Sequence, residues 1–412
     1  MDQTPHIFQG YGVELEYIIV REDSLDILPV ADQLLRAVSG SDESEVEMGS
    51  IGWSNELVLH VVELKTNGPV ATLNGLAPLF QEHVVHANRL LSGMGGRLMP
   101  TAMHPWMDPD RETRLWPHDS HEIYDAYNSI FGCHGHGWSN VQSTHINLAF
   151  NGDEEFGRLH TAVRLILPLI PALAASSPFV DGRQGKALDS RLEFYKTNQL
   201  QVPVIAGAII PEPVVSRREY EEKIFARIYR DIAPFDPKGI LQHEWLNSRG
   251  AIARFDRSAI EIRLVDIQEC PKADLAVTAA IIGVIKALVS EQWSPMTAQL
   301  SLTVEELAII LDLAIQHGEQ AKIDNRRFLE MFGINRDSAH AGEIWEHLVK
   351  ASLLGLHDDQ PEISSALNLI LQQGTLAQRL IMASNGNTSH RKLHELYLQL
   401  CHCLAQGELF EV

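Results

Sequence analysis

The chain has 412 residues, 45% of them hydrophobic, and carries 33 Lys and Arg against 54 Asp and Glu, a net charge of −21. This length fits two or three domains, or one large domain with an appendage. The acidic balance disfavours nucleic acid as a partner, because phosphate binding requires a basic surface. The longest apolar run, residues 275–285, is short of the ~20 residues that span a bilayer, so no membrane partner is expected. With no secretory signal at its start, the sequence predicts a cytoplasmic protein.

The first predicted element is a strand over residues 12–20, in which apolar and acidic residues alternate. Successive side chains of a strand point to opposite faces, so Glu14 and Glu16 share one face and the apolar side chains share the other. Two adjacent carboxylates repel each other, and cations held by oxygen ligands would explain the pair. The alternative is a solvated face on an edge strand.

Two further segments predict strands with polar residues on one face. Residues 55–66 are rich in β-branched side chains and form one or two strands, with Glu63 near the end. A strand over 142–150 places His145 and Asn147 on one face. A single strand histidine is more often structural than a ligand, and His145 gains interest only because other polar strands accompany it.

The last polar strand belongs to a predicted hairpin, formed by residues 251–255 and 259–266. Glu261 and Arg263 share one face of its second strand, and the alternating apolar residues share the other: Ile260, Ile262 and Leu264. An antiparallel sheet with one face open would gather the polar side chains of all these strands on a single surface.

The other segments predict loops and helices. Residues 39–50 and 94–142 predict loops, and the second, rich in Gly, Pro, His and Trp, is long enough to be functional or mobile. Helical periodicity predicts helices over 29–38, 72–93, 155–177 (split by Pro168 and Pro171), 217–231, 274–290, 303–317, 325–332, 342–353, 361–371 and 388–406.

This order of elements predicts an α+β fold, with an antiparallel sheet open on one face as the active site and helices on the other face. We expect a catalytic domain over residues 1–290 and a helical C-terminal region over 291–412 packed on it. Four cysteines without a disulfide framework, Cys133, Cys270, Cys401 and Cys403, give no covalent nucleophile.

Seven motifs in order resemble those of the glutamate–cysteine ligase type 2, or carboxylate–amine ligase, family. They cover about residues 10–290 and read GVELE, VVELKTNGP, GGRLMPTAMHPW, STHINLAF, LPLIPALAASSPFVDG, SRLEF and ARFDRSAIEIRLVD. The resemblance implies a glutamine-synthetase-like catalytic sheet that uses ATP with Mg²⁺, or with Mn²⁺. It also implies small-molecule substrates, namely glutamate or another carboxylate and an amino acid or amine as acceptor. Homodimerisation stays open.

Carried over motif by motif, the resemblance implies a role for each polar residue. The metal ligands are Glu14, Glu16, Glu63, His145 and Glu261. His145 and Asn147 would contact the nucleotide, Arg263 would hold the phosphate, and Arg254 and Arg191 would contact phosphate or a substrate carboxylate. The chemistry agrees, because transfer of a phosphoryl group needs its charge neutralised by cations and arginine. Two alternatives remain open: a metal-dependent amide hydrolase, and a non-catalytic homologue that binds a nucleotide or metabolite.

Overall fold

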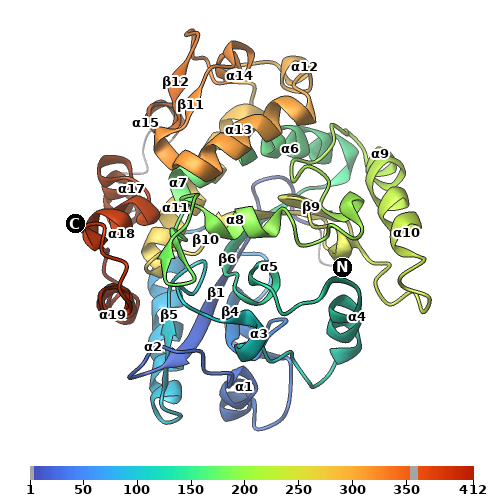
Figure 1. Ribbon diagram of the computed structural model, residues 1–412. Helices are drawn as coiled ribbons and strands as arrows, with labels where there is room; N and C mark the ends of the chain where they lie inside the picture. The colour runs from blue at the N-terminus through green and yellow to red at the C-terminus, as the bar shows by residue number, and fades with distance from the viewer. Residues whose placement is uncertain (1–3, 353–360) are drawn as a thin grey trace.

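The computed structural model describes residues 4–352 and 361–412. Its centre is an eight-stranded sheet in the order β2-β3-β4-β1-β6-β10-β9, with β5 also paired to β1 (Figure 1). Every pairing in this sheet is antiparallel. The strands are β1 (Tyr11–Arg21), β2 (Glu45–Met48), β3 (Ile51–Asn55), β4 (Val61–Thr66), β5 (Gly96–Met99), β6 (Ser143–Ala149), β9 (Ala251–Arg254) and β10 (Ala259–Asp266).

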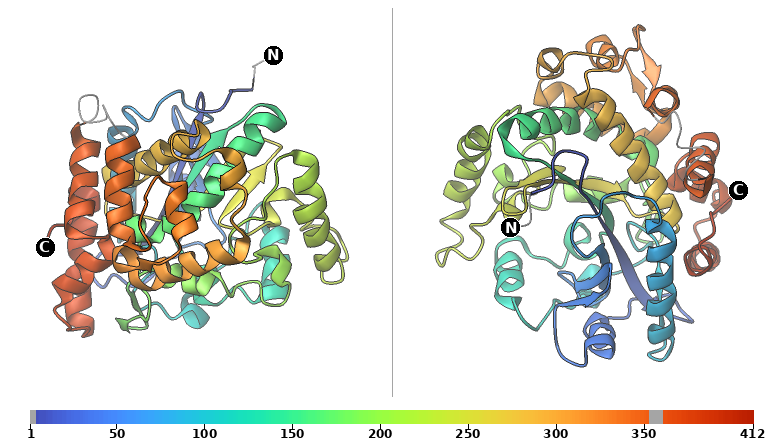
Figure 2. Two further views of the ribbon diagram at one scale, coloured as in Figure 1. Left: turned by 90° about the horizontal axis from the view of Figure 1, so that it is seen from above. Right: turned by 180° about the vertical axis from the view of Figure 1, so that it is seen from behind.

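Three long helices cover the apolar face of the sheet, as the view from behind shows (Figure 2): α2 (Leu76–Ser92), α6 (Gly152–Ile166) and α11 (Pro271–Val289). Val13, Leu15 and Tyr17 of β1 are fully buried beneath them. Helix α11 is apolar on nearly all sides because it also packs against α15 (Ala341–Ser352) and α17 (Pro361–Gln373). The alternation read in the sequence therefore places the main core on one side of β1, while Ile18 and Val20 on the other side join a second, smaller cluster.

The opposite, polar face carries short helices rather than long ones, and Figure 1 shows α5 and α8 drawn across β6 and β10. Helix α1 (Ala31–Ser39) packs on β3 and α2 at the apolar face. The other short helices in this part of the chain include α3 (Pro109–Glu112), α4 (His121–Phe131), α5 (His136–Ser139), α8 (Ser190–Tyr195), α9 (Arg217–Tyr220) and α10 (Ala226–Ile232). A π-helical turn over Glu221–Phe225 joins α9 to α10.

The C-terminal third is helical apart from a small strand pair within residues 322–340, and a second small strand pair lies earlier in the chain, within residues 179–184. Helix α17 packs on α11, and α19 packs on α2 and β5. The remaining elements are α7 (Pro171–Ala174), α12 (Met296–Gln299), α13 (Val304–His317), α14 (Arg326–Met331), α18 (Leu376–Ser384), α19 (His390–Gln406), the strand pair β7 (Phe179–Val180) and β8 (Arg183–Gln184), and the strand pair β11 (Lys322–Ile323) and β12 (Ala339–His340).

One buried ion pair ties this helical third to the sheet domain. Arg379 of α18 donates to Glu269, at 2.6 Å between Nη1 and Oε1, and both side chains are fully buried. The backbone of Phe410 joins them, with its N–H donating to Glu269 and its carbonyl accepting from Arg379. The largest hydrophobic cluster likewise runs from Tyr11 to Leu404.

The α+β prediction is confirmed, and two local predictions need correction. Residues 94–142 are not one loop, because β5, α3, α4 and α5 lie there; two of these helices have only four residues, too few to show a period. Residues 39–50 include the edge strand β2, whose exposed glutamates made the segment read as a loop. The last position of the helix predicted over residues 342–353 lies outside the described residues.

Two further expectations can be compared with the structure. None of the helices described is long and apolar enough to cross a membrane. All four cysteines are free and buried. Burial raises the pKa of the Cys133 thiol to about 12, so at neutral pH this thiol is protonated and a poor nucleophile.

Candidate active site

The polar face of the sheet gathers the predicted side chains by strand register. Glu16 of β1 lies opposite Glu63 of β4, and Glu14 lies opposite His145 of β6. Asn147, two residues further along β6, lies opposite Glu261 of β10. Four adjacent strands therefore bring these residues to one surface, although they are up to 247 positions apart in the numbering of the chain.

Glu14 and His145 form a close ion pair at the centre of this surface. His145 Nδ1 donates to Glu14 Oε2 at 2.9 Å, and Asn147 Nδ2 donates to Glu14 Oε1 at 2.9 Å. Burial alone would raise the pKa of Glu14, but the hydrogen bond and charge of His145 lower it to about 2. Burial would likewise lower the pKa of His145, yet the carboxylates of Glu16 and Glu14 raise it to about 9.

Glu16 and Glu63 are held by hydroxyl groups of the neighbouring strands. The backbone N–H and the hydroxyl of Ser143 donate to Glu16 at 2.7 and 3.0 Å. Ser54 donates its hydroxyl to Glu63 at 2.7 Å, and Lys65 Nζ lies 3.3 Å from the same carboxylate. Burial and the charge of Glu14 raise the pKa of Glu63 well above its ordinary value.

Sequence reasoning missed Glu56, which follows the last residue of β3. Burial and the charge of Glu16 raise the pKa of Glu56 to about 7. The sequence does contain a signal for Glu56. Glu56 lies two residues after Ser54, so strand alternation places both on one face, and the hydroxyl of Ser54 faces Glu63. The strand prediction over residues 55–66 began at the last residue of β3 and left the rest of that strand out, so this alternation was not followed.

The carboxylates have the spacing that divalent cations need. One group of ligand atoms, from Glu14, Glu63 and His145, lies within 4.8 Å of one another, and a second, from Glu16, Glu56 and Glu63, does so too. Glu63 belongs to both groups. Oxygen ligands with one imidazole suit Mg²⁺ or Mn²⁺. The raised pKa values of Glu56 and Glu63 agree, because like charges this close require a counter-charge or a proton.

Glu261 stands slightly apart, between two arginines. Arg263 Nε lies 3.1 Å from Glu261 Oε1, and Arg254 Nη1 lies 3.3 Å from Oε2. Its carboxylate also lies 3.9 Å from His145 Nδ1. The charge of Glu261 raises the pKa of Arg263 despite burial, which keeps this guanidinium cationic. Glu261 is in neither close group of ligand atoms found among the described residues, and its role as a metal ligand stays a prediction.

Arg191 lies beneath the site rather than in it. Its guanidinium is buried against Asp266 and reaches the backbone carbonyl of Arg263 at 3.4 Å. A direct contact with phosphate would require this pair to open. The structure therefore favours a supporting position for Arg191, next to the backbone of Arg263.

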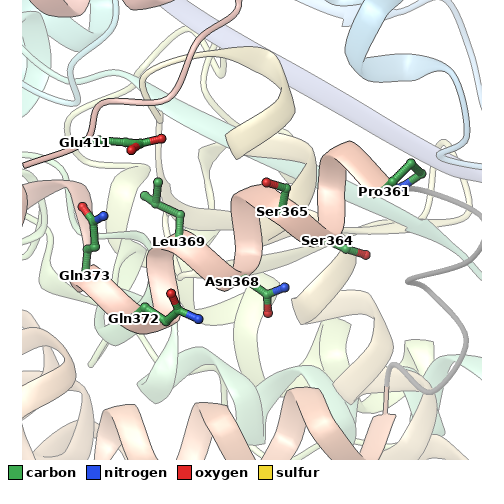
Figure 3. A pocket seen from close by; sticks show the side chains of 8 residues that line it. All are labelled: Pro361, Ser364, Ser365, Asn368, Leu369, Gln372, Gln373 and Glu411. Carbon is green, nitrogen blue, oxygen red and sulfur yellow. The ribbon is translucent and has the colours of Figure 1, made fainter.

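A shallow hollow of about 490 Å³ lies far from these residues in the fold, on the outer face of α17 (Figure 3). Its lining is polar and neutral apart from Glu411, with Ser365, Asn368 and Gln372 among the residues shown. No residue of the sheet lines it. We therefore assign the chemistry to the polar face of the sheet and not to this hollow.

Known proteins share both the sequence pattern and the fold. Residues 11–399 match the family model of the glutamate-cysteine ligase family 2 (GCS2). An uncharacterized protein of Archaeoglobus fulgidus is 32% identical over 403 residues, which is 97% of this chain and 99% of that protein. A putative glutamate–cysteine ligase 2 of Dechloromonas aromatica is 27% identical over 224 residues, covering 51% of this chain and 50% of that protein.

Among solved structures, the glutamate–cysteine ligase of Francisella tularensis in complex with AMP aligns with a TM-score of 0.62 at 10% identity. The alignment covers 96% of this chain and 89% of that one. The ligase PafA, solved in complex with the prokaryotic ubiquitin-like protein Pup, aligns with a TM-score of 0.51 at 12% identity, over 94% of this chain and 71% of that one. At such identities the alignments show a common fold.

Fold and family together place this protein among the carbon–nitrogen ligases. Within that class, the chain belongs to the glutamate–cysteine ligase family 2, whose model matches it from residue 11 to residue 399. The resemblance read from the motifs is thus confirmed, and it extends beyond residue 290 through most of the helical C-terminal region.

Proposed function

We propose that this protein is an ATP-dependent carboxylate–amine ligase that uses two divalent cations. The observation that carries the proposal is the pair of three-ligand groups joined at Glu63, on the same face of the sheet as Glu261 and its partner Arg263. Glu14 and Glu63 would hold one cation together with His145, whose imidazole would lose its proton when the cation displaces it from Glu14, and Glu16, Glu56 and Glu63 would hold the other. Bound Mg²⁺ would supply positive charge for the phosphates of ATP.

The proposed reaction has two steps. A carboxylate oxygen of the donor, glutamate or another acid, attacks the γ-phosphorus, the bond to the β-phosphate oxygen breaks, and an acyl phosphate and ADP form. An amine then attacks the acyl carbon, phosphate leaves, and an amide results. Arg263 suits the phosphoryl group because its planar guanidinium donates two parallel hydrogen bonds and stays charged. Arg254, beside Glu261, would keep that carboxylate in place.

The test is a screen of carboxylates and amines with ATP and MgCl₂, in which ADP, phosphate and the mass of the product are measured. We expect ADP and phosphate in equal amounts, only when donor, acceptor and Mg²⁺ are all present. The variant Glu47→Gln, on the exposed edge strand β2, serves as a control that keeps activity. Turnover that persists in excess chelator would contradict the cation sites. Amide hydrolysis without ATP would favour the hydrolase alternative.

A further inference from the structure

A lysine lies on the polar face of the sheet, beside the proposed cation ligands. Lys65 of β4 is opposite Glu14 in the strand register and follows Glu63 by two residues. Its Nζ lies 3.3 Å from Glu63 Oε1, and the hydroxyl of Ser54 donates to the same oxygen at 2.7 Å. Glu63 is the carboxylate that belongs to both groups of ligand atoms. The ammonium of Lys65 therefore stands next to the ligand that both cations would share.

Lys65 has a second carboxylate within reach, at the edge of the sheet. Its Nζ also lies 3.3 Å from Oε1 of Glu45, on the edge strand β2. Gly52 of β3 pairs with Lys65, and a Cβ added there would lie 3.9 Å from both Lys65 Cγ and Glu45 Oε1. The two side chains thus meet over the backbone of Gly52. Lys65 is shared between a carboxylate inside the site and one outside it.

The two carboxylates differ in how much they depend on Lys65. The side chain of Glu45 is 53% exposed, whereas that of Glu63 is 8% exposed. Water screens the charge of Glu45, so its pair with Lys65 is weak. The buried charge of Glu63 requires a counter-charge close by. Without a bound cation, Lys65 is therefore needed at Glu63, and its flexible four-carbon stem lets it reach either partner.

A divalent cation at Glu63 would reverse this balance. Its two positive charges would lie close to the ammonium of Lys65, and like charges repel strongly in a partly buried site. Cation binding would therefore require Lys65 to leave Glu63, which weakens the binding. Glu45 would reduce this penalty, because it accepts the ammonium on the far side of Gly52.

We propose that Lys65 is a tethered counter-ion of Glu63 that lowers the affinity of the site for divalent cations, and that Glu45 receives it when a cation binds. The inference rests on the proposed function and deepens it, because it names the residues that set the cation requirement. A lysine that only oriented Glu63 would act in the opposite direction, since the loss of such a partner weakens metal binding by about 10–100-fold. The sign of the effect therefore separates the two roles.

The experiment measures binding of Mn²⁺ in the absence of ATP and substrates, from the electron paramagnetic resonance signal of the free ion. We expect Lys65→Met to bind Mn²⁺ at least tenfold more tightly than the wild type, because the competing charge is gone. Glu45→Gln should bind Mn²⁺ at least threefold more weakly, because Lys65 then has only Glu63 as its partner.

Two matched controls and a double variant complete the test. Lys223→Met removes the same charge from a surface pair with Glu219 at 2.8 Å, and Glu47→Gln removes an exposed carboxylate two residues from Glu45 on β2. Both should bind Mn²⁺ as the wild type does. The double variant Lys65→Met/Glu45→Gln should have the affinity of Lys65→Met alone, because Glu45 acts only through Lys65.

Weaker or unchanged binding of Mn²⁺ by Lys65→Met overturns the inference. So does an effect of Glu45→Gln that is absent, or that persists without Lys65. If Lys65→Met does not fold, Glu45→Gln decides alone, because its side chain is exposed and its substitution leaves the core intact.

The same measurements keep the inference separate from the proposed function. Equal Mn²⁺ affinities of the wild type and Lys65→Met, together with ADP formation by the wild type, overturn the inference and leave the ligase activity standing. Tighter Mn²⁺ binding by Lys65→Met with no ADP from any substrate pair supports the inference and overturns the proposed function. An absence of Mn²⁺ binding in both proteins overturns the cation sites and the inference with them.

Discussion

At the scale of single residues, the carboxylates of the site differ in how their charge is balanced. Glu14 has a protein cation beside it, since His145 and its hydrogen bond hold the pKa of Glu14 near 2. Glu56 and Glu63 have raised pKa values and lie next to other carboxylates. The second group of ligand atoms therefore depends more strongly on a bound cation than the first.

We predict that Glu56→Gln weakens Mg²⁺ binding. The substitution removes one carboxylate from the group formed with Glu16 and Glu63, and we expect the Mg²⁺ concentration needed for half-maximal rate to rise at least tenfold. Titration of activity with Mg²⁺ measures this, with Glu47→Gln as the matched control. An unchanged Mg²⁺ requirement in a folded Glu56→Gln protein would remove Glu56 from the site.

Arg263 gives a second prediction at this scale. Arg263→Lys keeps the positive charge but loses the two-pronged geometry, so the rate should fall by orders of magnitude, as expected of a group that contributes ~3 kcal/mol or more to the transition state. The Tm should change little, because the side chain is partly exposed. A protein that is strongly destabilised yet active would instead make Arg263 a structural partner of Glu261.

At the scale of elements, β10 contains a bulge that decides where Arg263 and Asp266 point. Ile262 pairs with Ile146 and Val265 pairs with Thr144, so two residues of β10 face one residue of β6. Beyond the bulge, Asp266 lies opposite Ser143 and shares its face. In a regular strand Asp266 would have pointed to the helices, where it could not meet Arg191.

Gly250 makes room for this bulge. Its carbonyl accepts the N–H of Arg263 at 2.9 Å, and a Cβ at this position would lie 2.6 Å from a methyl group of Leu264. We predict that Gly250→Ala displaces Leu264 and Arg263 together, which lowers kcat at least tenfold. Steady-state kinetics with saturating ATP measure this effect. The control is Gly49→Ala, in a turn where an added Cβ meets no other atom, and we expect it to keep kcat. Full activity in Gly250→Ala would show that the backbone at Arg263 tolerates displacement.

Strand alternation predicted which side chains share the polar face of the sheet, and its failures have a physical origin. It placed Glu14, Glu16 and Glu261 on the polar face because a period of two is fixed by backbone geometry. A bulge interrupts that period, and no residue pattern in the sequence marks its position. The placement of Asp266 on the polar face was therefore not predicted. Helices α3 and α5 lay in a segment read as a loop, since four-residue helices show no period. Which side chains meet across strands depends on register, which the sequence does not encode locally.

At the scale of the whole molecule, several histidines are buried in the core away from the site. His60 donates to the carbonyl of Ser139 at 2.7 Å and His104 to that of Leu25 at 2.7 Å, and both rings are fully buried. Burial lowers the pKa of each to about 4, and that of His160 to about 3. An unfolded histidine titrates near ~6.5, so each of these groups is neutral in the folded chain where it would be charged in the unfolded one.

These shifts predict a loss of stability in acid. Between pH ~6.5 and about 4 the unfolded chain binds more protons than the folded one, so the free energy of unfolding falls as the pH falls, by on the order of 1 kcal/mol per pH unit for each histidine. The Tm of the metal-free protein between pH 7.5 and 5 measures this. His104→Gln should flatten the dependence relative to wild type, while His243→Gln, at an exposed position, should not. Equal slopes in all three proteins would contradict the assignment.

The expected division into residues 1–290 and 291–412 stays a prediction. The structure adds one observation that bears on it. The cluster from Tyr11 to Leu404 gives both parts a common core. Whether residues 1–290 fold alone therefore depends on how much of α11 stays covered without α17 and α15.

The buried pair of Glu269 and Arg379 also has a consequence for the order in which contacts form while the chain is being synthesised. The partners of Glu269 are 110 and 141 residues further along, at Arg379 and Phe410. Translation at ~5–20 residues per second adds the later one roughly 7–30 seconds after Glu269 itself. During that interval the sheet can already pair, but the charge at the start of α11 has no counter-ion and resists burial. The contact of Glu269 with Arg379 and Phe410 therefore forms only after both of these residues have been made, well after the strands of the sheet.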